Sequence, residues 1–176
     1  MVALTELCKS FFLTDWGHVA AVWSDQGLWE LSFPQPAIEL AVAGLSTAAV
    51  KQLPDLTDHC PEDALQDELR LYFRGYSVPF TVPVDWRGYS PFQAAVLKHT
   101  ARIAYGRMQS YGEVALAIGK PKAARAVGGA LHINRTPIVV PCHRVVGKNG
   151  ALTGFGGGLE LKKALLLLEN EQYVCQ

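Results

Sequence analysis

The stretch Ile138-Val139-Val140-Pro141-Cys142-His143-Arg144-Val145-Val146 constrains the fold of this chain more than any other part of the sequence. β-Branched residues favour strands, and here they stand on both sides of a cysteine. Pro141 lacks a backbone donor and cannot continue a central strand, so the chain is predicted to turn there. This pattern places Cys142 in a turn at the mouth of a strand, where a thiol can meet a ligand.

A cysteine of this kind is often only a small buried hydrophobe, so a base nearby has to be found before it is called a nucleophile. His143 follows Cys142 directly. Neighbours in an extended segment point to opposite sides, and a bridging water is then an alternative to direct contact. A carboxylate orients a basic imidazole best, and the acids after the cysteine are Glu160, Glu169 and Glu171.

The charge of the chain is divided unevenly, although its formal net charge is zero. Residues 1–85 contain 4 basic and 12 acidic residues, a balance of −8, and residues 86–176 contain 12 and 4, a balance of +8. A half-chain excess of cations is typical of a surface that binds nucleic acid. Contact between two oppositely charged halves is the alternative explanation.

The other cysteines, Cys8, Cys60 and Cys175, form no zinc-binding pattern, and a disulfide framework is not expected in a chain of this length. No apolar run is long enough to span a membrane, and the first residues lack the basic segment of a signal peptide. We therefore expect a reduced compartment, the cytoplasm, or the nucleus if the source is eukaryotic. A monomer is also expected.

The first half, residues 1–85, is predicted to be a small α/β domain with an antiparallel sheet that supports the second half. Apolar and polar residues alternate from Phe11 to Phe33 around a turn at residues 24–27, which favours two or three strands. Prolines mark the expected starts of two helices and an extended crossing segment, at Pro36, Pro61, Pro79 and Pro83.

The second half, residues 86–176, is predicted to be mostly helical. Ser90-Pro91-Phe92-Gln93 combines an N-cap, a proline at the first helical position and a capping glutamine, so a helix is expected from there to about Tyr105. Further helices are expected from Tyr111 to Ile118 and, after a glycine, from Pro121 to about His132. Two helices joined in this way give a helix-turn-helix pattern.

One face of the expected 121–132 helix combines cations with residues that almost lack side chains. The residues predicted to face inward are Ala123, Val127, Ala130 and Leu131. The outer face carries Lys122, Arg125, Ala126, Gly129 and His132. Such a face allows a helix backbone to approach a groove closely. An ordinary packed helix would explain Gly128 but not the outer cations.

A loop with few side chains, Gly154-Phe155-Gly156-Gly157-Gly158, follows the cysteine stretch. Glycines allow a flat ligand to approach the backbone, and a flexible hinge is the equal alternative. Beyond it, Leu161, Leu165 and Leu168 form one stripe, which predicts an amphipathic helix over 159–169.

Pro141-Cys142-His143-Arg144-Val145-Val146 resembles the active-site signature of the methylated-DNA–protein-cysteine methyltransferases, also called O(6)-alkylguanine-DNA alkyltransferases. The resemblance extends over most of the second half, through Ser110–Ala115, Pro121–Ala130, Asn134, Gly157–Leu159 and Leu168–Glu169. It implies an α+β fold: a small α/β domain, then a mostly helical domain with a winged-helix-like helix-turn-helix. Little in the first half matches the family.

The resemblance implies DNA repair by direct reversal. An alkyl group on O6 of a guanine flipped out of double-stranded DNA would pass irreversibly to Cys142 in a single turnover; reaction with O4-alkylthymine is left open. The implied catalytic residues are Cys142, His143, Glu169 and Asn134. Glu169 would orient His143, which would reach Cys142 through water, and Asn134 would brace the helix before it. No metal and no cofactor are expected.

The resemblance also implies which residues hold the base and the DNA. Arg125 resembles the finger that fills the gap left by the flipped base, and Tyr111 the residue that crowds the 3′ phosphate. The expected substrate-binding residues are Tyr111, Pro137, Val145, Phe155 and Gly156. The expected DNA-binding residues are Tyr111, Gly112, Lys120, Lys122, Arg125, Ala126, Gly129 and Lys148. Some relatives have Tyr-Ser-Gly-Gly where this chain has residues 155–158, which predicts a more open pocket.

Three other functions fit parts of the sequence. An alkyltransferase-like protein binds lesions without transfer, but such proteins replace the nucleophile, usually by tryptophan. A helix-turn-helix regulator with a structural Cys142 should read base sequence, which a small-residue face does not favour. A thiol hydrolase would turn over repeatedly and ignore DNA.

Overall fold

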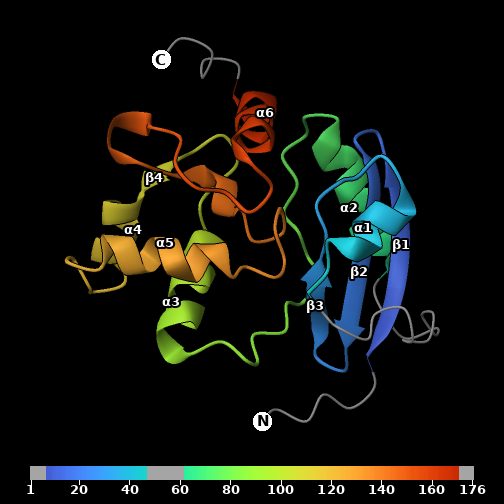
Figure 1. Ribbon diagram of the computed structural model, residues 1–176, viewed down its shortest axis with the longest axis horizontal. Coiled ribbons are helices and arrows are strands. Elements are labelled where there is room, and N and C mark those ends of the chain that lie inside the picture. The colour runs from blue at the N-terminus through green and yellow to red at the C-terminus, as the bar shows by residue number, and fades with distance from the viewer. Residues whose placement is uncertain (1–6, 47–61, 171–176) are drawn as a thin grey trace. The chain divides into compact units, whose positions relative to one another are not determined.

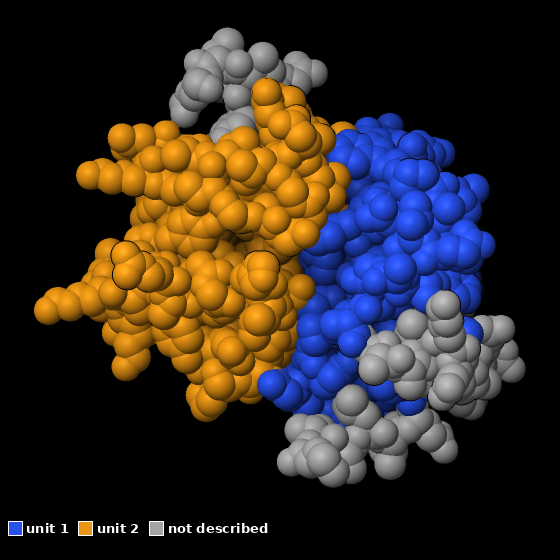
Figure 2. Space-filling view, viewed as in Figure 1, with its two compact units in different colours: residues 1–88, 135–137 blue, residues 89–134, 138–176 orange. Residues whose placement is uncertain are grey.

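The structure of this chain, a computed structural model, describes residues 7–46 and 62–170. They form two compact units (Figure 1, Figure 2): residues 1–88 with 135–137, and residues 89–134 with 138–176. The division expected after residue 85 lies close to Gly88. The return of residues 135–137 to the first unit was not foreseen from the sequence.

An antiparallel sheet forms the centre of the first unit, as predicted for the region between Phe11 and Phe33. Its strands, in sheet order, are β1 (Cys8–Thr14), β2 (Gly17–Ser24) and β3 (Gly27–Leu31). The expected turn joins β2 to β3, and Gly27 has a φ of +127°, which favours glycine. Residues 19–24 of β2 are all buried, so this middle strand carries much of the unit's core.

Two helices pack against this sheet. Helix α1 (Ile38–Ala43) contacts β2, and helix α2 (Glu62–Phe73) contacts β1. The expected start of the second helix at Pro61 lies outside the described residues. After Gly75 the chain forms neither helix nor strand up to Val84, which makes an isolated parallel bridge with Leu28 of β3.

The second unit is mostly helical, so the chain has the expected α+β class. Its helices are α3 (Pro91–Thr100), α4 (Tyr111–Ala117), α5 (Ala124–His132) and α6 (Leu159–Glu169). Short strands β4 (Gln109–Ser110) and β5 (Val145–Val146) pair in parallel, with the 3₁₀ turns η2 (Cys142–Arg144) before β5 and η3 (Lys148–Gly150) after it. Helices α3, α4 and α5 contact one another, which places the helix-turn-helix pattern in one packed cluster.

The start of α3 was predicted correctly and its end was not. Ser90 and Gln93 form a full capping box, with Pro91 in the first turn. The helix ends at Thr100 rather than near Tyr105, because the carbonyl of Ile103 accepts from Arg144 and the backbone N–H of Gly106 donates to Glu169. Tertiary hydrogen bonds thus replace the last helical ones.

The start of α5 also differs from the prediction. The helix begins at Ala124 and not at Pro121, because residues 120–123 form a turn closed by a 2.8 Å hydrogen bond from the Ala123 N–H to the Lys120 carbonyl. The predicted faces are nevertheless correct for the helical residues: Val127, Ala130 and Leu131 are buried, and the outer residues are exposed. No helix in the described ranges is long and apolar enough to cross a membrane.

Candidate active site

Cys142 begins the 3₁₀ turn η2, so the turn predicted at Pro141 is present. The strand predicted before it is absent from residues 138–140, because Ile138 has a φ of +73° and the chain turns there. Tertiary packing therefore overrides the β-propensity of this apolar run. The result is a cysteine held between two turns, with its residue only 7% exposed.

Asn134 holds both the cysteine and the segment before it. Its side-chain Nδ2 donates to the carbonyl of Val140 at 2.9 Å and to the Cys142 sulfur at 3.2 Å. Burial raises the pKa of the Cys142 thiol, and the hydrogen bond from Asn134 offsets part of that rise. In this state the thiol is protonated at neutral pH, and a proton acceptor is needed to make it nucleophilic.

That acceptor is available in His143, whose Nε2 lies 2.7 Å from Oε1 of Glu169. Both side chains are buried, at 0% and 1% exposure. Burial lowers the pKa of His143 despite the carboxylate, so the imidazole is neutral at pH 7. Because an ionised carboxylate can only accept, Nε2 carries the ring hydrogen and Nδ1 carries the basic lone pair.

Glu169 is fixed by more than the histidine. Arg144 donates to it from Nε at 2.8 Å and from Nη2 at 3.0 Å, and the Gly106 N–H donates at 3.1 Å. Burial alone would raise the pKa of Glu169, but hydrogen bonds from His143 and Arg144 hold it at about 2. The carboxylate is therefore ionised at every pH at which the protein would work.

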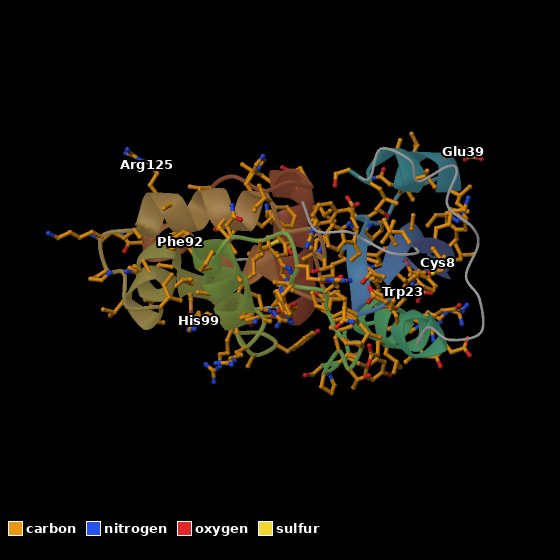
Figure 3. All side chains as sticks on the ribbon, turned by 90° about the horizontal axis from the view of Figure 1, so that it is seen from below. Cys8, Trp23, Glu39, Phe92, His99 and Arg125 are labelled. Carbon is orange, nitrogen blue, oxygen red and sulfur yellow. The ribbon has the colours of Figure 1, made fainter. Side chains whose placement is uncertain are left out.

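A cavity of about 590 Å³ opens beside the thiol. Its lining residues are Tyr111, Ala124, Arg125, Gly128, Gly129, Leu131, His132, Cys142, Thr153, Gly154, Phe155 and Gly156. The structure thus brings the predicted helix face, glycine loop and cysteine to one cavity. Arg125 projects from the surface of its unit (Figure 3), and the Tyr111 hydroxyl donates to the Thr153 carbonyl at 3.3 Å.

Other predicted residues do not line this cavity. Val145, expected to bind the substrate, is buried, and its carbonyl accepts from Lys162. Pro137 belongs to the first unit. The predicted DNA-binding residues outside the cavity are all exposed on the second unit: Gly112, Lys120, Lys122, Ala126 and Lys148.

Lys162 is the residue that the sequence analysis missed most clearly. Its Nζ is fully buried and donates to the carbonyls of Val145 at 2.7 Å and Thr153 at 3.1 Å. Burial lowers its pKa to about 8, and its ammonium group attracts the thiolate form of Cys142. A faint signal existed: Lys162 lies seven residues before Glu169, on the same face of α6.

The described residues contain no cluster of three or more His, Cys, Asp or Glu side chains that could hold a metal ion. What the site offers is a buried thiol, a neutral imidazole and a fixed carboxylate beside an open cavity. This arrangement can generate a thiolate and present it to an electrophile held in the cavity.

Comparison with known sequences places the site in a wider context. The family model for the DNA-binding domain of 6-O-methylguanine DNA methyltransferase matches residues 91–171. A methylated-DNA–protein-cysteine methyltransferase of Mycobacterium bovis is 51% identical over 106 residues, 60% of this chain and 64% of that protein. The constitutive methylated-DNA–protein-cysteine methyltransferase of Bacillus subtilis is 44% identical over 124 residues, 70% of this chain and 71% of that protein. The match thus spans less than two thirds of the Mycobacterium bovis protein.

Solved structures resemble the chain over more of its length. The crystal structure of Mycobacterium tuberculosis O6-methylguanine methyltransferase has a TM-score of 0.78 at 34% identity, over 97% of this chain and 96% of that one. The structure of Mycobacterium tuberculosis OGT in complex with DNA has a TM-score of 0.75 at 34% identity, over 96% and 94%. This similarity includes the first unit, where the sequence alone offered few matches.

Proposed function

Since this chain belongs to the 6-O-methylguanine DNA methyltransferase family, we propose that it repairs DNA by transferring an alkyl group from O6 of guanine to Cys142. The observation that carries the proposal is the buried Cys142 thiol at the cavity, followed directly in the sequence by His143, whose ring is hydrogen-bonded to Glu169. A thiol without an activated base would not attack an ether carbon at neutral pH.

The proposed reaction begins with removal of the thiol proton from Cys142. Nδ1 of His143 accepts that proton through a water, while Glu169 stabilises the imidazolium that forms. The bond from Sγ to the alkyl carbon then forms as the bond from that carbon to O6 breaks. The proton that His143 took from the thiol passes through solvent to the leaving guanine, which restores neutral guanine and neutral imidazole. The thioether product has no leaving group and no residue assigned to remove it, so each molecule reacts once.

The DNA side of the proposal rests on the exposed residues of α5 and on burial of the thiol. A base stacked in a duplex cannot reach a sulfur buried to this degree, so it has to be flipped out. Arg125 has a long, exposed side chain next to the small Ala126. We assign it the role of filling the gap that the flipped base leaves in the duplex. The surface lysines Lys120, Lys122 and Lys148 are assigned to the phosphate backbone.

We assign the reaction to a monomer acting on double-stranded DNA in the cytoplasm, where cellular reductants keep a nucleophilic thiol reduced. Support for a monomer is that every proposed catalytic residue comes from one unit of one chain.

The test is the mass of the intact protein after incubation with a duplex oligonucleotide that carries O6-methylguanine. We expect one added methyl group per molecule, mapped to the peptide that contains Cys142. Unmethylated duplex and Cys142→Ser serve as controls and should show no gain. Binding without a mass change would favour an alkyltransferase-like protein, and more than one equivalent of repaired base per protein would favour a hydrolase.

A further inference from the structure

Arg135 is anchored by four contacts within the first unit. Its guanidinium carbon lies 3.5 Å from the centroid of the Trp29 ring. Its Nη2 donates to the carbonyl of Arg87 at 2.6 Å and to that of Asp85 at 3.3 Å, and its own carbonyl accepts from the Leu31 N–H at 2.7 Å. The planar guanidinium stacks on Trp29 while one of its nitrogens donates to two carbonyls, a combination that an ammonium group cannot reproduce.

This anchor lies in a short excursion of the chain. Residues 135–137 belong to the first unit, although their neighbours Asn134 and Ile138 on either side both belong to the second. Asn134 donates to the Cys142 sulfur. Ile138 is buried with a φ of +73°, a conformation that persists in a β-branched residue only where its surroundings impose it.

We propose that Arg135 is a positioning residue for the thiol: it holds the backbone between Asn134 and Ile138 and so keeps the Asn134 amide on the Cys142 sulfur. Arg135 does not touch the substrate in this scheme. The inference rests on the proposed alkyl transfer, but it concerns the thiol itself and is measurable without DNA.

A change in thiol reactivity follows from this coupling. The hydrogen bond from Asn134 counteracts the rise in the pKa of Cys142 that burial causes. If the amide turns away, thiolate becomes scarcer at neutral pH and alkylation slows. The other charged and titratable groups near the thiol are Lys162, His143 and its partner Glu169.

The experiment measures alkylation of Cys142 by iodoacetamide against pH, with mass spectrometry of peptides to separate this cysteine from the others. We compare wild type with Arg135→Ala, Trp29→Ala, Asn134→Ala and the Arg135→Ala/Asn134→Ala double variant. We expect Arg135→Ala to slow the reaction about tenfold at neutral pH, the equivalent of one lost hydrogen bond, and to move its profile to higher pH. Trp29→Ala should change the rate and the pH profile in the same direction, since it removes the ring on which Arg135 stacks without replacing Arg135 itself.

The double variant decides between positioning and bulk stability. If Arg135 acts through Asn134, the double variant reacts no more slowly than Asn134→Ala alone. Arg74→Ala is the matched control, since it removes an exposed arginine of the same unit that pairs with Asp15, and it should leave the profile unchanged.

Two results would overturn the inference. One is a double variant slowed by the product of the two single effects, and the other is a lower melting temperature in Arg135→Ala and Trp29→Ala with an unchanged pH profile. Failure of the wild type to take a methyl group from DNA would instead reject the proposed function and leave this result standing.

Discussion

Replacing Glu169 with glutamine tests the charge of this carboxylate separately from its size. The substitution leaves the buried guanidinium of Arg144 without an anionic partner and weakens the hold on His143. The fall of the Glu169 pKa from 4.5 to about 2 corresponds to ~3 kcal/mol of stability at neutral pH. Breaking a buried ion pair costs about 3–5 kcal/mol, which agrees with this figure.

The direction of the pH dependence follows from the sign of the change. The folded-state pKa of Glu169 lies below the unfolded value, so its stabilisation is complete above about pH 4.5 and is lost as the pH falls towards 2. Urea unfolding at neutral pH should show Glu169→Gln to be less stable by ~3 kcal/mol. At about pH 3 the gap should narrow, because the wild type has lost part of this stabilisation.

Glu160→Gln is the control, since Glu160 is an exposed acid on the same helix. This substitution should leave the free energy of unfolding unchanged both at neutral pH and at about pH 3. A gap between wild type and Glu169→Gln that stays constant from neutral to acid pH would refute the reasoning, because the carboxylate would then contribute by packing alone. We also expect Glu169→Gln to slow alkylation more than it weakens DNA binding, measured by rate and gel shift in parallel.

Three further outcomes are expected. Full methylation of Cys142 should lower the melting temperature, because overpacking costs roughly 1–3 kcal/mol and ~1 kcal/mol shifts a domain of this size by about 2–4 °C; an unchanged calorimetric melt would mean spare room in the cavity. Arg125→Ala should slow repair of a paired lesion more than of a mispaired one, since an intercalated arginine offsets the unstacking cost; equal slowing in the two assays would make it a phosphate contact. Wild type should gain stability between about pH 8 and 10.5, because Lys162 binds fewer protons in the folded state than in the unfolded chain over this range. Lys162→Met should show no such gain when urea unfolding is measured in alkaline buffer.

Local signals in the sequence were enough for much of the fold. The turn at residues 24–27 located two strands, the Ser90 and Gln93 pair located the start of α3, and the leucine pattern gave both ends of α6. The family resemblance also named Cys142, His143, Glu169 and Asn134 in advance, and their roles stay a prediction. The structure joins them in two hydrogen-bonded pairs, Asn134 with Cys142 and His143 with Glu169.

Features that depend on distant partners could not be read in this way. The positive φ of Ile138 is imposed by its surroundings and contradicts the β-propensity of its own segment. Lys162 is buried because carbonyls of Val145 and Thr153 accept from it, and neither is adjacent in sequence. Leu161 and Leu168, expected on the buried stripe of α6, are only half-buried, since Lys162 and Glu169 occupy that face.

The protonated resting state of Cys142 also bears on how well the protein withstands oxidants. Peroxides and small electrophiles attack thiolates, so a buried thiol with a raised pKa reacts slowly with them. In a protein that reacts once, oxidation of the Cys142 sulfur would inactivate the molecule as completely as the proposed alkyl transfer does. Under the proposed function, keeping the sulfur protonated until a damaged base enters the cavity would reserve it for that base. The number of lesions that could be corrected would then equal the number of protein molecules, however long each had been in the cell.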